Sequence, residues 1–365
     1  MSYSGPAIEH TKLRNVAVLL GVAALAFAEP KDSGKQDLTD RRVPVWSTPV
    51  GSDTRALAFS PDDKYLALAS FNGHPVVVDV QAPKTNIRSL DLAGGCGIDL
   101  AWNESSDVIL VCGALVRLGD GTTCRVSYGV SNAFWLDSQH IVRSTGEILD
   151  LSCRVVGQWC LQPGWSIAGV AASKGWVLLE RVEGQAPALT CQYSIIDRDS
   201  HRTLTGWPTR KAPCGGSEML AAGAEALCFD LDDGFVDNER LDCRAISGGK
   251  EIHIPRQVRG FELNQAAAFS PRVVADKWRH DREPLWAELL TWWLWPSIEE
   301  GFPLPRQRVV FDIRSGKLIA SWKPRVQHST SPYVQDWPYR CALSSKGELL
   351  AESGDGTLEL YRFAP

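Results

Sequence analysis

The sequence predicts an all-β fold, a seven-bladed β-propeller, from three observations. A motif of an apolar strand, a polar turn and a second apolar strand recurs seven times after residue 42. Successive motifs are 33 to 51 residues apart, except for a last interval of 74, and one four-stranded blade takes about 40–50 residues. The segment 43–50 (VPVWSTPV) is a strand without a unit of its own. Because a strand pair that buries one face is unstable alone, we expect the units to stack radially.

The seven motifs align at one small or apolar position in the first strand. They are LAFSPDDKYLALAS, LAWNESSDVILVCG, AFWLDSQHIVRS, GVAASKGWVLLER, MLAAGAEALCFDL, AAAFSPRVVADKW and CALSSKGELLAES, with Ala58, Ala101, Phe134, Val170, Ala221, Ala268 and Ala342 at the equivalent position. A second strand pair with a tight polar turn follows most of them, for example in residues 74–90 and 308–322. Each unit therefore supplies up to four strands.

The two ends of the repeat region complement each other. The last unit stops at Phe363 after three strands, so it lacks a fourth. We expect the strand 43–50 to supply it, with Val45 and Leu360 on neighbouring strands. This pairing would close the ring and remove an exposed sheet edge.

The first 28 residues have the pattern of an export signal. Lys12 and Arg14 precede the apolar run 16–28 (VAVLLGVAALAFA), and Ala26-Phe27-Ala28 offers a small-x-small cleavage site. A membrane anchor is the alternative, but 13 apolar residues are fewer than the roughly 20 that a spanning helix needs. We therefore expect a signal peptide at 1–28, a polar linker at 29–42 and the propeller at 43–365, in a periplasmic or extracellular protein.

All ten cysteines lie beyond the signal, and an even set in an oxidising compartment predicts disulfides. Cys112 and Cys124 flank a Gly-Asp-Gly turn, and Cys228 and Cys243 flank Asp-Asp-Gly, so each pair is expected to bond across a hairpin. A zinc site is not expected, because the chain has no Cys-x-x-Cys.

The motifs resemble those of WD40-type and YVTN-type propellers. Residues 59–70 (FSPDDKYLALAS) are similar to the strand-turn-strand of these families, residues 310–322 (VFDIRSGKLIASW) resemble the strand pair that follows, and residues 343–363 resemble a whole terminal unit. The Gly-His and Trp-Asp dipeptides of WD40 repeats are missing. The resemblance thus implies a WD40-like propeller without the His–Asp network of that family.

The sequence identifies no catalytic residues. It contains no Gly-x-Ser-x-Gly, no phosphate-binding glycine loop and no His-Glu-x-x-His, and six of its seven histidines fall in different parts of the repeat region. The acidic segment 230–239 has glycine where a calcium loop needs a ligand, so we interpret it as a solvated hairpin tip. No cofactor or metal is expected. The 43 acidic and 38 basic residues are too balanced to predict nucleic-acid binding.

The long last interval contains a tryptophan-rich insertion at about 277–306. Its core 284–295 (PLWAELLTWWLW) predicts a helix that begins at Pro284 and is stopped by Pro296. Its wide apolar surface, which includes Trp286, Leu289, Trp292, Trp293 and Trp295, predicts either a helix packed on the propeller rim or a docking surface. The helix is too short to span a membrane, although contact with a membrane surface stays open.

Three classes of function follow from these observations. An exported chain with blades, disulfides and no catalytic signature favours a binding or scaffold module for a protein or small ligand. A propeller enzyme, a lactonase-like hydrolase or a lyase, would need charged groups that converge from several blades. An envelope-surface assembly component would dock through the tryptophan-rich insertion.

Overall fold

The computed structural model describes 15 parts of the chain: residues 43–51, 54–70, 74–92, 100–126, 133–184, 190–204, 210–213, 219–222, 226–231, 240–245, 262–266, 270–277, 307–327, 337–338 and 340–363. All of them belong to the compact unit Thr39–Pro365. The predicted signal, the linker 29–42 and residues 278–306 of the insertion, with its helix, lie outside the described residues. In the described part, the helical structure is the 3-10 turn η1 (Ala172–Lys174), and no helix there is long and apolar enough to span a bilayer.

The described strands form six sheets of four strands, one of three and one of two. The first sheet holds β2 (Thr54–Phe59), β3 (Tyr65–Ser70), β4 (Val76–Asp79) and β5 (Ile87–Ser89). The second holds β6 (Leu100–Trp102), β7 (Val108–Val111), β8 (Ala114–Arg117) and β9 (Thr123–Arg125). The third holds β10 (Ala133–Trp135), β11 (His140–Arg143), β12 (Glu147–Asp150) and β13 (Val155–Gln158).

The remaining sheets continue the same antiparallel order. The fourth holds β14 (Trp165–Ala171), β15 (Trp176–Glu183), β16 (Thr190–Asp197) and β17 (Arg210–Pro213), and the fifth β18 (Met219–Ala222), β19 (Ala226–Leu231) and β20 (Arg240–Ala245). The sixth holds β21 (Glu262–Ala266), β22 (Arg272–Lys277), β23 (Gln307–Asp312) and β24 (Leu318–Trp322). The last holds β27 (Arg340–Leu343), β28 (Leu349–Gly354), β29 (Thr357–Arg362) and β1 (Trp46–Pro49), while β25 (Val326–Gln327) pairs with β26 (Trp337–Pro338).

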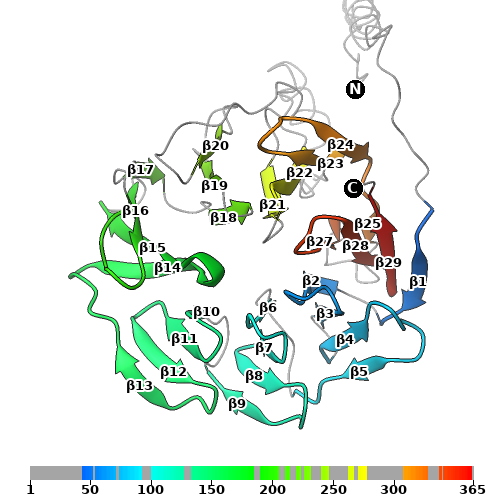
Figure 1. The fold of residues 1–365 in the computed structure, drawn as a ribbon, viewed down its shortest axis with the longest axis horizontal. Helices are drawn as coiled ribbons and strands as arrows, with labels where there is room; N and C mark the ends of the chain where they lie inside the picture. Colours follow the sequence, from blue (N-terminus) through cyan, green and yellow to red (C-terminus); the bar gives the residue numbers. More distant parts are fainter. Residues whose placement is uncertain are drawn as a thin grey trace, which may run out of the picture. The chain divides into compact units, whose positions relative to one another are not determined.

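In the seven sheets of three or four strands, the strand named first for each sheet above contacts the first-named strands of two other sheets. The contacts join β2 to β6, β6 to β10, β10 to β14, β14 to β18, β18 to β21, β21 to β27 and β27 to β2. Figure 1 shows these first strands on the inner side, with β5, β9 and β13 outside. Six of the seven equivalent positions of the repeat lie on these strands, whereas Ala268 lies outside the described residues. The repeat therefore corresponds to one sheet per unit.

The strand near the amino terminus belongs to the same sheet as the carboxyl-terminal strand. β1 pairs antiparallel with β29, so that Trp46 lies opposite Leu360, and the Val45 N–H donates to the Leu360 carbonyl at 2.7 Å. The expected pairing of these two segments is thus observed. In addition, the Trp46 indole N–H donates to the Val80 carbonyl of the neighbouring sheet at 3.0 Å.

Successive side chains of the second strands point to opposite faces and enter different cores. Leu66 and Leu68 of β3 pack with Ala351 and Leu358 of the last sheet. Ala67 and Ala69, the alternate residues of the same strand, pack against Ile109 and Val111 of the second sheet. The first sheet is therefore buried on both faces by its neighbours, which is why its inner strands are almost continuously apolar rather than alternating.

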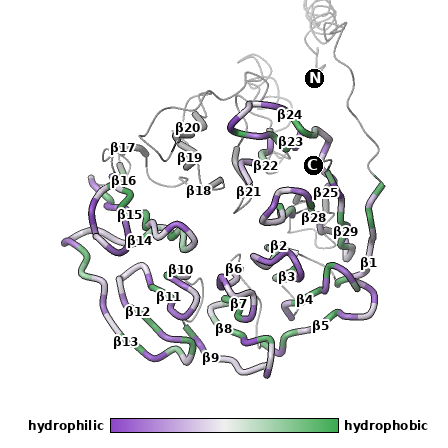
Figure 2. The backbone as a smooth tube through the Cα atoms, viewed as in Figure 1, coloured by the Kyte–Doolittle hydropathy of each residue, from purple (hydrophilic) through white to green (hydrophobic). Residues whose placement is uncertain are grey.

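The outer strands β5, β9 and β13 are largely exposed, and they carry the exposed apolar residues Ile87, Val155 and Val156 beside polar ones. All three residues of β5 (Ile87–Ser89) are exposed, whereas all four of β7 (Val108–Val111) are buried. Figure 2 shows the hydrophobic residues in the strands and many of the hydrophilic ones in the connecting turns. Burying one large apolar side chain contributes about 1.5–3 kcal/mol to the stability of the fold. Most of this contribution comes from the inner strands.

One predicted disulfide has a different partner in the structure. Cys124 bonds to Cys153, with a Cα–Cα distance of 5.9 Å, and not to Cys112. The hairpin across the Gly-Asp-Gly turn joins β8 and β9 and places Cys124 opposite Leu115, while Cys112 lies one turn earlier, between β7 and β8. The bond instead links β9 to the turn after β12, which is in the next sheet, so it joins two units that the repeat alone treats as separate.

The other cysteines differ in state. Cys112 and Cys191 are also disulfide-bonded. Cys228 and Cys243 are opposite each other in the register of β19 and β20, as expected of a hairpin, and the bond between them stays a prediction. Cys160 is an exposed free thiol and Cys341 a buried one. Burial raises the pKa of the Cys341 thiol to about 12, so it is protonated at neutral pH.

We expect peptide-resolved alkylation to distinguish these cysteines. Iodoacetamide at about pH 8 should label Cys160 in the native protein and Cys341 only after denaturation, because the thiolate is the reactive form. A non-reducing digest should yield one linked peptide that contains Cys124 and Cys153. Labelling of Cys124 or Cys153 without reductant would contradict the inter-sheet bond.

A buried cluster of charges lies between the sixth and the last sheet. The Arg308 guanidinium of β23 donates to both carboxylate oxygens of Asp276 at 2.7 and 2.8 Å and to Glu352 Oε1 at 2.8 Å. The Trp322 indole N–H donates to the same Glu352 oxygen at 3.0 Å. Desolvation alone would lower the pKa of Arg308, but the acidic groups around it, Cys341, Asp276 and Glu352, hold that pKa well above its usual value. Arg308 is therefore charged and bound to carboxylates of two sheets.

Candidate functional site

The turns between the first and second strands carry the polar residues of the repeated motif. Between β2 and β3, the Ser60 hydroxyl donates to Asp62 Oδ1 at 2.7 Å and accepts the Tyr65 N–H at 2.9 Å. Between β6 and β7, Asn103 Oδ1 accepts the N–H groups of Asp107 and Val108 at 3.1 and 3.0 Å. These bonds satisfy backbone donors where the strands turn, which explains why Ser, Asn and Asp recur there.

The same turns are bonded to one another from sheet to sheet. The bonds run from Ser345 N–H to Asp63 Oδ1 at 2.7 Å, from Asp62 N–H to Ser106 Oγ at 3.2 Å, from Asn103 Nδ2 to the Ser138 carbonyl at 3.3 Å and from an Arg272 N–H to the Gly347 carbonyl at 2.9 Å. The turns therefore form a connected layer at one end of the sheets.

Two aspartates of this layer, Asp62 and Asp137, have a pKa below the usual value of the side chain. Burial alone would raise the pKa of Asp62, but the hydrogen bonds from Ser60 and Lys64 outweigh it, and the pKa is lowered. The same holds for Asp137, which is bonded by Gln139 and His140. A lowered pKa stabilises the fold above the unfolded-state value of about 3.9, and this stabilisation is lost as the pH falls through the folded-state pKa.

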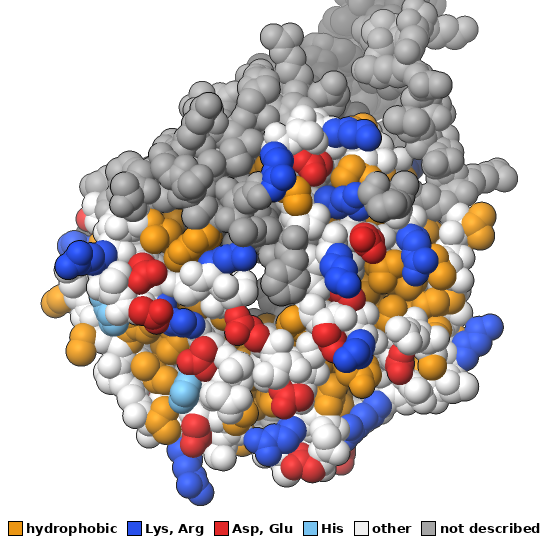
Figure 3. All heavy atoms as spheres, in the orientation of Figure 1, with side chains coloured by type: hydrophobic (Ala, Val, Ile, Leu, Met, Phe, Trp, Pro, Cys, Tyr) orange, Lys and Arg blue, Asp and Glu red, His pale blue; other side chains and the backbone are white. Residues whose placement is uncertain are grey.

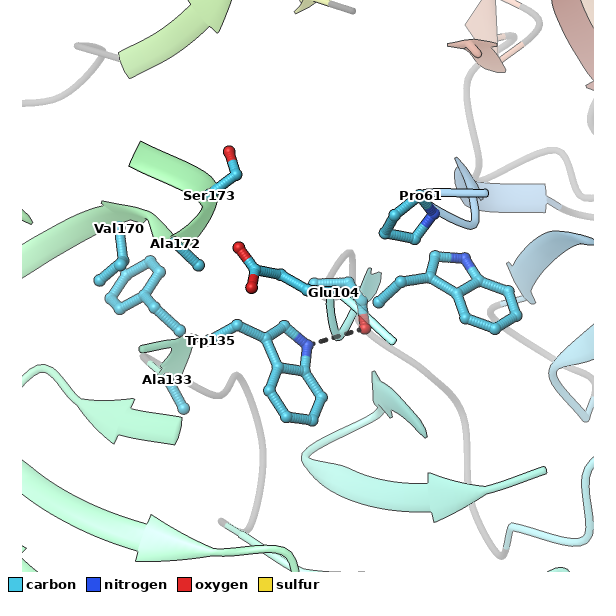
Figure 4. Close-up of a pocket in the computed structure, with 10 residues that line it drawn as sticks. Pro61, Glu104, Ala133, Trp135, Val170, Ala172 and Ser173 are labelled. Carbon is cyan, nitrogen blue, oxygen red and sulfur yellow. Dashed lines mark hydrogen bonds between the residues drawn. The ribbon is translucent and has the colours of Figure 1, made fainter. Parts of the chain in front are cut away.

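A recess of about 570 Å³ opens among these turns. It is bounded by the β2–β3 turn, the first strands β6, β10 and β14, and η1 (Figure 4), and its lining residues are Pro61, Ala101, Trp102, Glu104, Ala133, Phe134, Trp135, Val170, Ala172 and Ser173. Small-molecule and cofactor sites in proteins have volumes of about 300–1,000 Å³ and are mostly apolar, with a few polar groups. The recess has both properties.

The two tryptophans of the recess are held by the neighbouring sheet. The Trp102 indole N–H donates to the Ala58 carbonyl at 3.0 Å. The Trp135 indole N–H donates to the Ala101 carbonyl at 3.1 Å, the bond drawn as a dashed line in Figure 4. Ala58 and Ala101 are equivalent positions of the repeat, and each tryptophan directly follows such a position. The aromatic wall is therefore fixed by the packing of successive sheets.

Glu104 is the charged residue among those that line the recess. It is exposed, and it makes no hydrogen bond or ion pair with the residues that the structure describes. Figure 4 shows its carboxylate pointing into the recess on the side of Ala172 and Ser173. The site thus combines aromatic and aliphatic walls with one carboxylate and one hydroxyl.

The histidines do not meet in the part of the chain that the structure describes. His140 Nδ1 lies 3.0 Å from both carboxylate oxygens of Asp137, and the His201 ring lies 4.7 Å from the ring of Trp159. Across the described residues, no three His, Cys, Asp or Glu side chains are placed to hold a metal ion. Asp230 lies on β19, whereas residues 232–239 and the predicted surface of Trp286, Leu289, Trp292, Trp293 and Trp295 lie outside the described part.

The sequence analysis did not identify the residues of the recess. One feature of the repeat could have pointed to the recess: a tryptophan follows the equivalent position in two successive units, at Trp102 and Trp135. The other feature was Glu104, an acidic residue in a turn where the first unit has proline. From the sequence alone, neither feature distinguishes a residue that binds a ligand from one that packs in the core. The distinction requires the positions of the neighbouring sheets.

Sheets of up to four antiparallel strands, whose first strands contact one another in succession, are the architecture of a β-propeller. The β-propeller domain of Cps50 (Swd1) from Myceliophteria thermophila is similar to this chain in structure, with a TM-score of 0.54 and 13% sequence identity. The match covers 87% of this chain and 100% of that domain. No family model and no curated protein sequence matches the chain. The structural likeness therefore shows the fold, and the function has to be argued from the site.

Proposed function

We propose that the chain is an exported binding or scaffold propeller that holds a partner in the recess formed by β6, β10, β14 and η1. The proposal rests on the recess, which lies at the layer of turns. Its aromatic wall is held by hydrogen bonds, and the Glu104 carboxylate beside it makes no ion pair with the described residues. WD40 propellers generally bind proteins, and this analogy of fold favours a protein over a small ligand as the partner.

The proposed architecture is a ring of seven blades that is closed by the amino-terminal strand. Seven sheets with three or four described strands support it, as does the succession of contacts that leads from β27 back to β2. The pairing of β1 with β29 supports the closure, since it gives the last blade its fourth strand. A ring of this kind fixes the turns that surround the recess.

The proposed location is an oxidising compartment outside the cytoplasm. The Cys124–Cys153 bond and the bonded state of Cys112 and Cys191 support it, because disulfides persist in such compartments. The apolar run at 16–28 supports export, because it has the pattern of a signal peptide. The tryptophan-rich insertion at about 277–306 is proposed, as an alternative, to dock on an envelope-surface partner.

Site-specific photo-crosslinking tests the binding function. Ser173 at the recess and Ser89 on the outer strand β5 are both exposed serines, so they form a matched pair for a photoreactive amino acid. With the secreted fraction of the source cells, we expect a discrete adduct from position 173 and little from position 89. Excess unlabelled wild-type protein should abolish the adduct, whereas an Ala172→Trp competitor, with its recess filled, should not. Equal adducts from the two positions would contradict a binding role for the recess.

A further inference from the structure

The aromatic wall of the recess offers no hydrogen-bond donor to a ligand. Both indole N–H groups are used, by the Ala58 carbonyl for Trp102 and by the Ala101 carbonyl for Trp135. Apart from Glu104 and Ser173, the other lining residues are Phe134 and small aliphatic residues. A ligand therefore meets ring carbons and methyl groups on these sides, which suit an aliphatic stem or the face of a delocalised cation.

The charge of the recess excludes two kinds of occupant. An anion would be repelled by Glu104, and no Lys or Arg is among the described lining residues to offset it. A wholly apolar occupant would remove the Glu104 carboxylate from water without giving it a partner, which costs free energy. A cation avoids both costs, because it pairs with the carboxylate as water is displaced.

Arg198 is a basic group that interacts only weakly with Glu104. Its pKa is raised mainly by the hydrogen bond to Asp199, and Glu104 makes a smaller contribution. The Arg198 Nε donates to Asp199 at 2.9 Å, and another guanidinium N–H donates to the Leu136 carbonyl at 2.8 Å. The Glu104 carboxylate is thus available to an incoming ligand. Over the described part of the face drawn in Figure 3, acidic and basic side chains are interspersed, so attraction of a cation depends on Glu104 locally.

We infer that the recess binds the cationic side chain of a partner polypeptide, an arginine or a lysine, with the charged end at Glu104 and the aliphatic stem against Trp102, Phe134 and Trp135. This inference rests on the proposed binding function and names the chemistry of the partner. A polypeptide fits because the recess opens between turns: Pro61 and Ser173 stand on different sheets at its rim, where a backbone can lie while one side chain enters (Figure 4).

A charge series of labelled peptides tests the inference on the full chain. The probes are Gly-Ala-Xaa-Ala-Gly peptides with Arg, Lys, Leu or Glu at the centre, with binding followed by fluorescence anisotropy. We expect the Arg and Lys peptides to bind at least about tenfold more tightly than the Leu peptide, and the Glu peptide to bind weakest. Glu104→Gln should remove about a tenfold preference for Arg over Leu, while Glu348→Gln, which alters an exposed glutamate in the equivalent turn before β28, should leave it unchanged.

Several results would overturn the inference. These are equal binding of the Arg and Leu peptides, no binding of any peptide, or a preference for Arg that survives Glu104→Gln. Binding of ethylguanidinium as tightly as the Arg peptide would overturn the assignment to a polypeptide. The crosslinking at Ser173 is an independent test of the proposed binding function. If position 173 yields adducts but the peptides show no charge preference, the recess is a binding site and the inference of a cationic partner is wrong.

Discussion

Arg308→Met is expected to lower the free energy of unfolding by about 3–5 kcal/mol. The guanidinium is buried and binds Asp276 in its own sheet and Glu352 in the last sheet. Methionine fills much of the same volume but leaves two buried carboxylates without their cation. The cost of two uncompensated charges exceeds the usual effect of a lost hydrogen bond, which is about 1 kcal/mol.

Equilibrium urea unfolding measures this effect, with Arg154→Met as the control. Arg154 is exposed beside β13, so its replacement should change stability by less than about 0.5 kcal/mol. A triple variant, Arg308→Met with Asp276→Leu and Glu352→Leu, should recover a large part of the loss, because no buried charge is then unpaired. If Arg308→Met unfolds at the same urea concentration as the wild type, the cluster does not join the two sheets energetically.

Deletion of residues 42–51 should cost more than about 4 kcal/mol, since it uncovers several large apolar side chains at about 1.5–3 kcal/mol each. β1 covers the edge of β29, whose Leu358 and Leu360 are 0% and 2% exposed. The deletion also removes Trp46, which packs in the same core and bonds to the neighbouring sheet. The exposed strand edge would in addition promote association between chains.

Thermal and urea unfolding of the truncated chain measure the loss, and a synthetic peptide of residues 42–51 provides the control. Added in trans, the peptide should restore part of the melting temperature, because it can pair with β29 in the same register. A scrambled peptide should not. A truncated chain that melts at the wild-type temperature would show that β1 contributes nothing to the stability of the last sheet.

Local patterns in the sequence were sufficient to predict the units of the fold. Strand, turn and strand could be read in each motif because side-chain alternation and turn residues depend on near neighbours along the chain. The pairing of the segment 43–50 with the carboxyl-terminal strand could be predicted as well, because the last unit visibly lacked a strand. The wrong pairing of Cys112 with Cys124 had the same local basis: it assumed that one hairpin contains both cysteines.

The all-β class, the repeat and the position of its turns could be predicted from the amino-acid sequence, since they follow from periods of two residues and from residues that favour turns. The structure was needed to show which sheet lies against which, and with it the Cys124–Cys153 bond, the Arg308 cluster and the recess at Glu104. Each of these features joins residues from different sheets. The distances between these residues depend on how the sheets pack. Packing depends on the burial of apolar surface between segments that are far apart in the sequence, so it cannot be read from a local pattern.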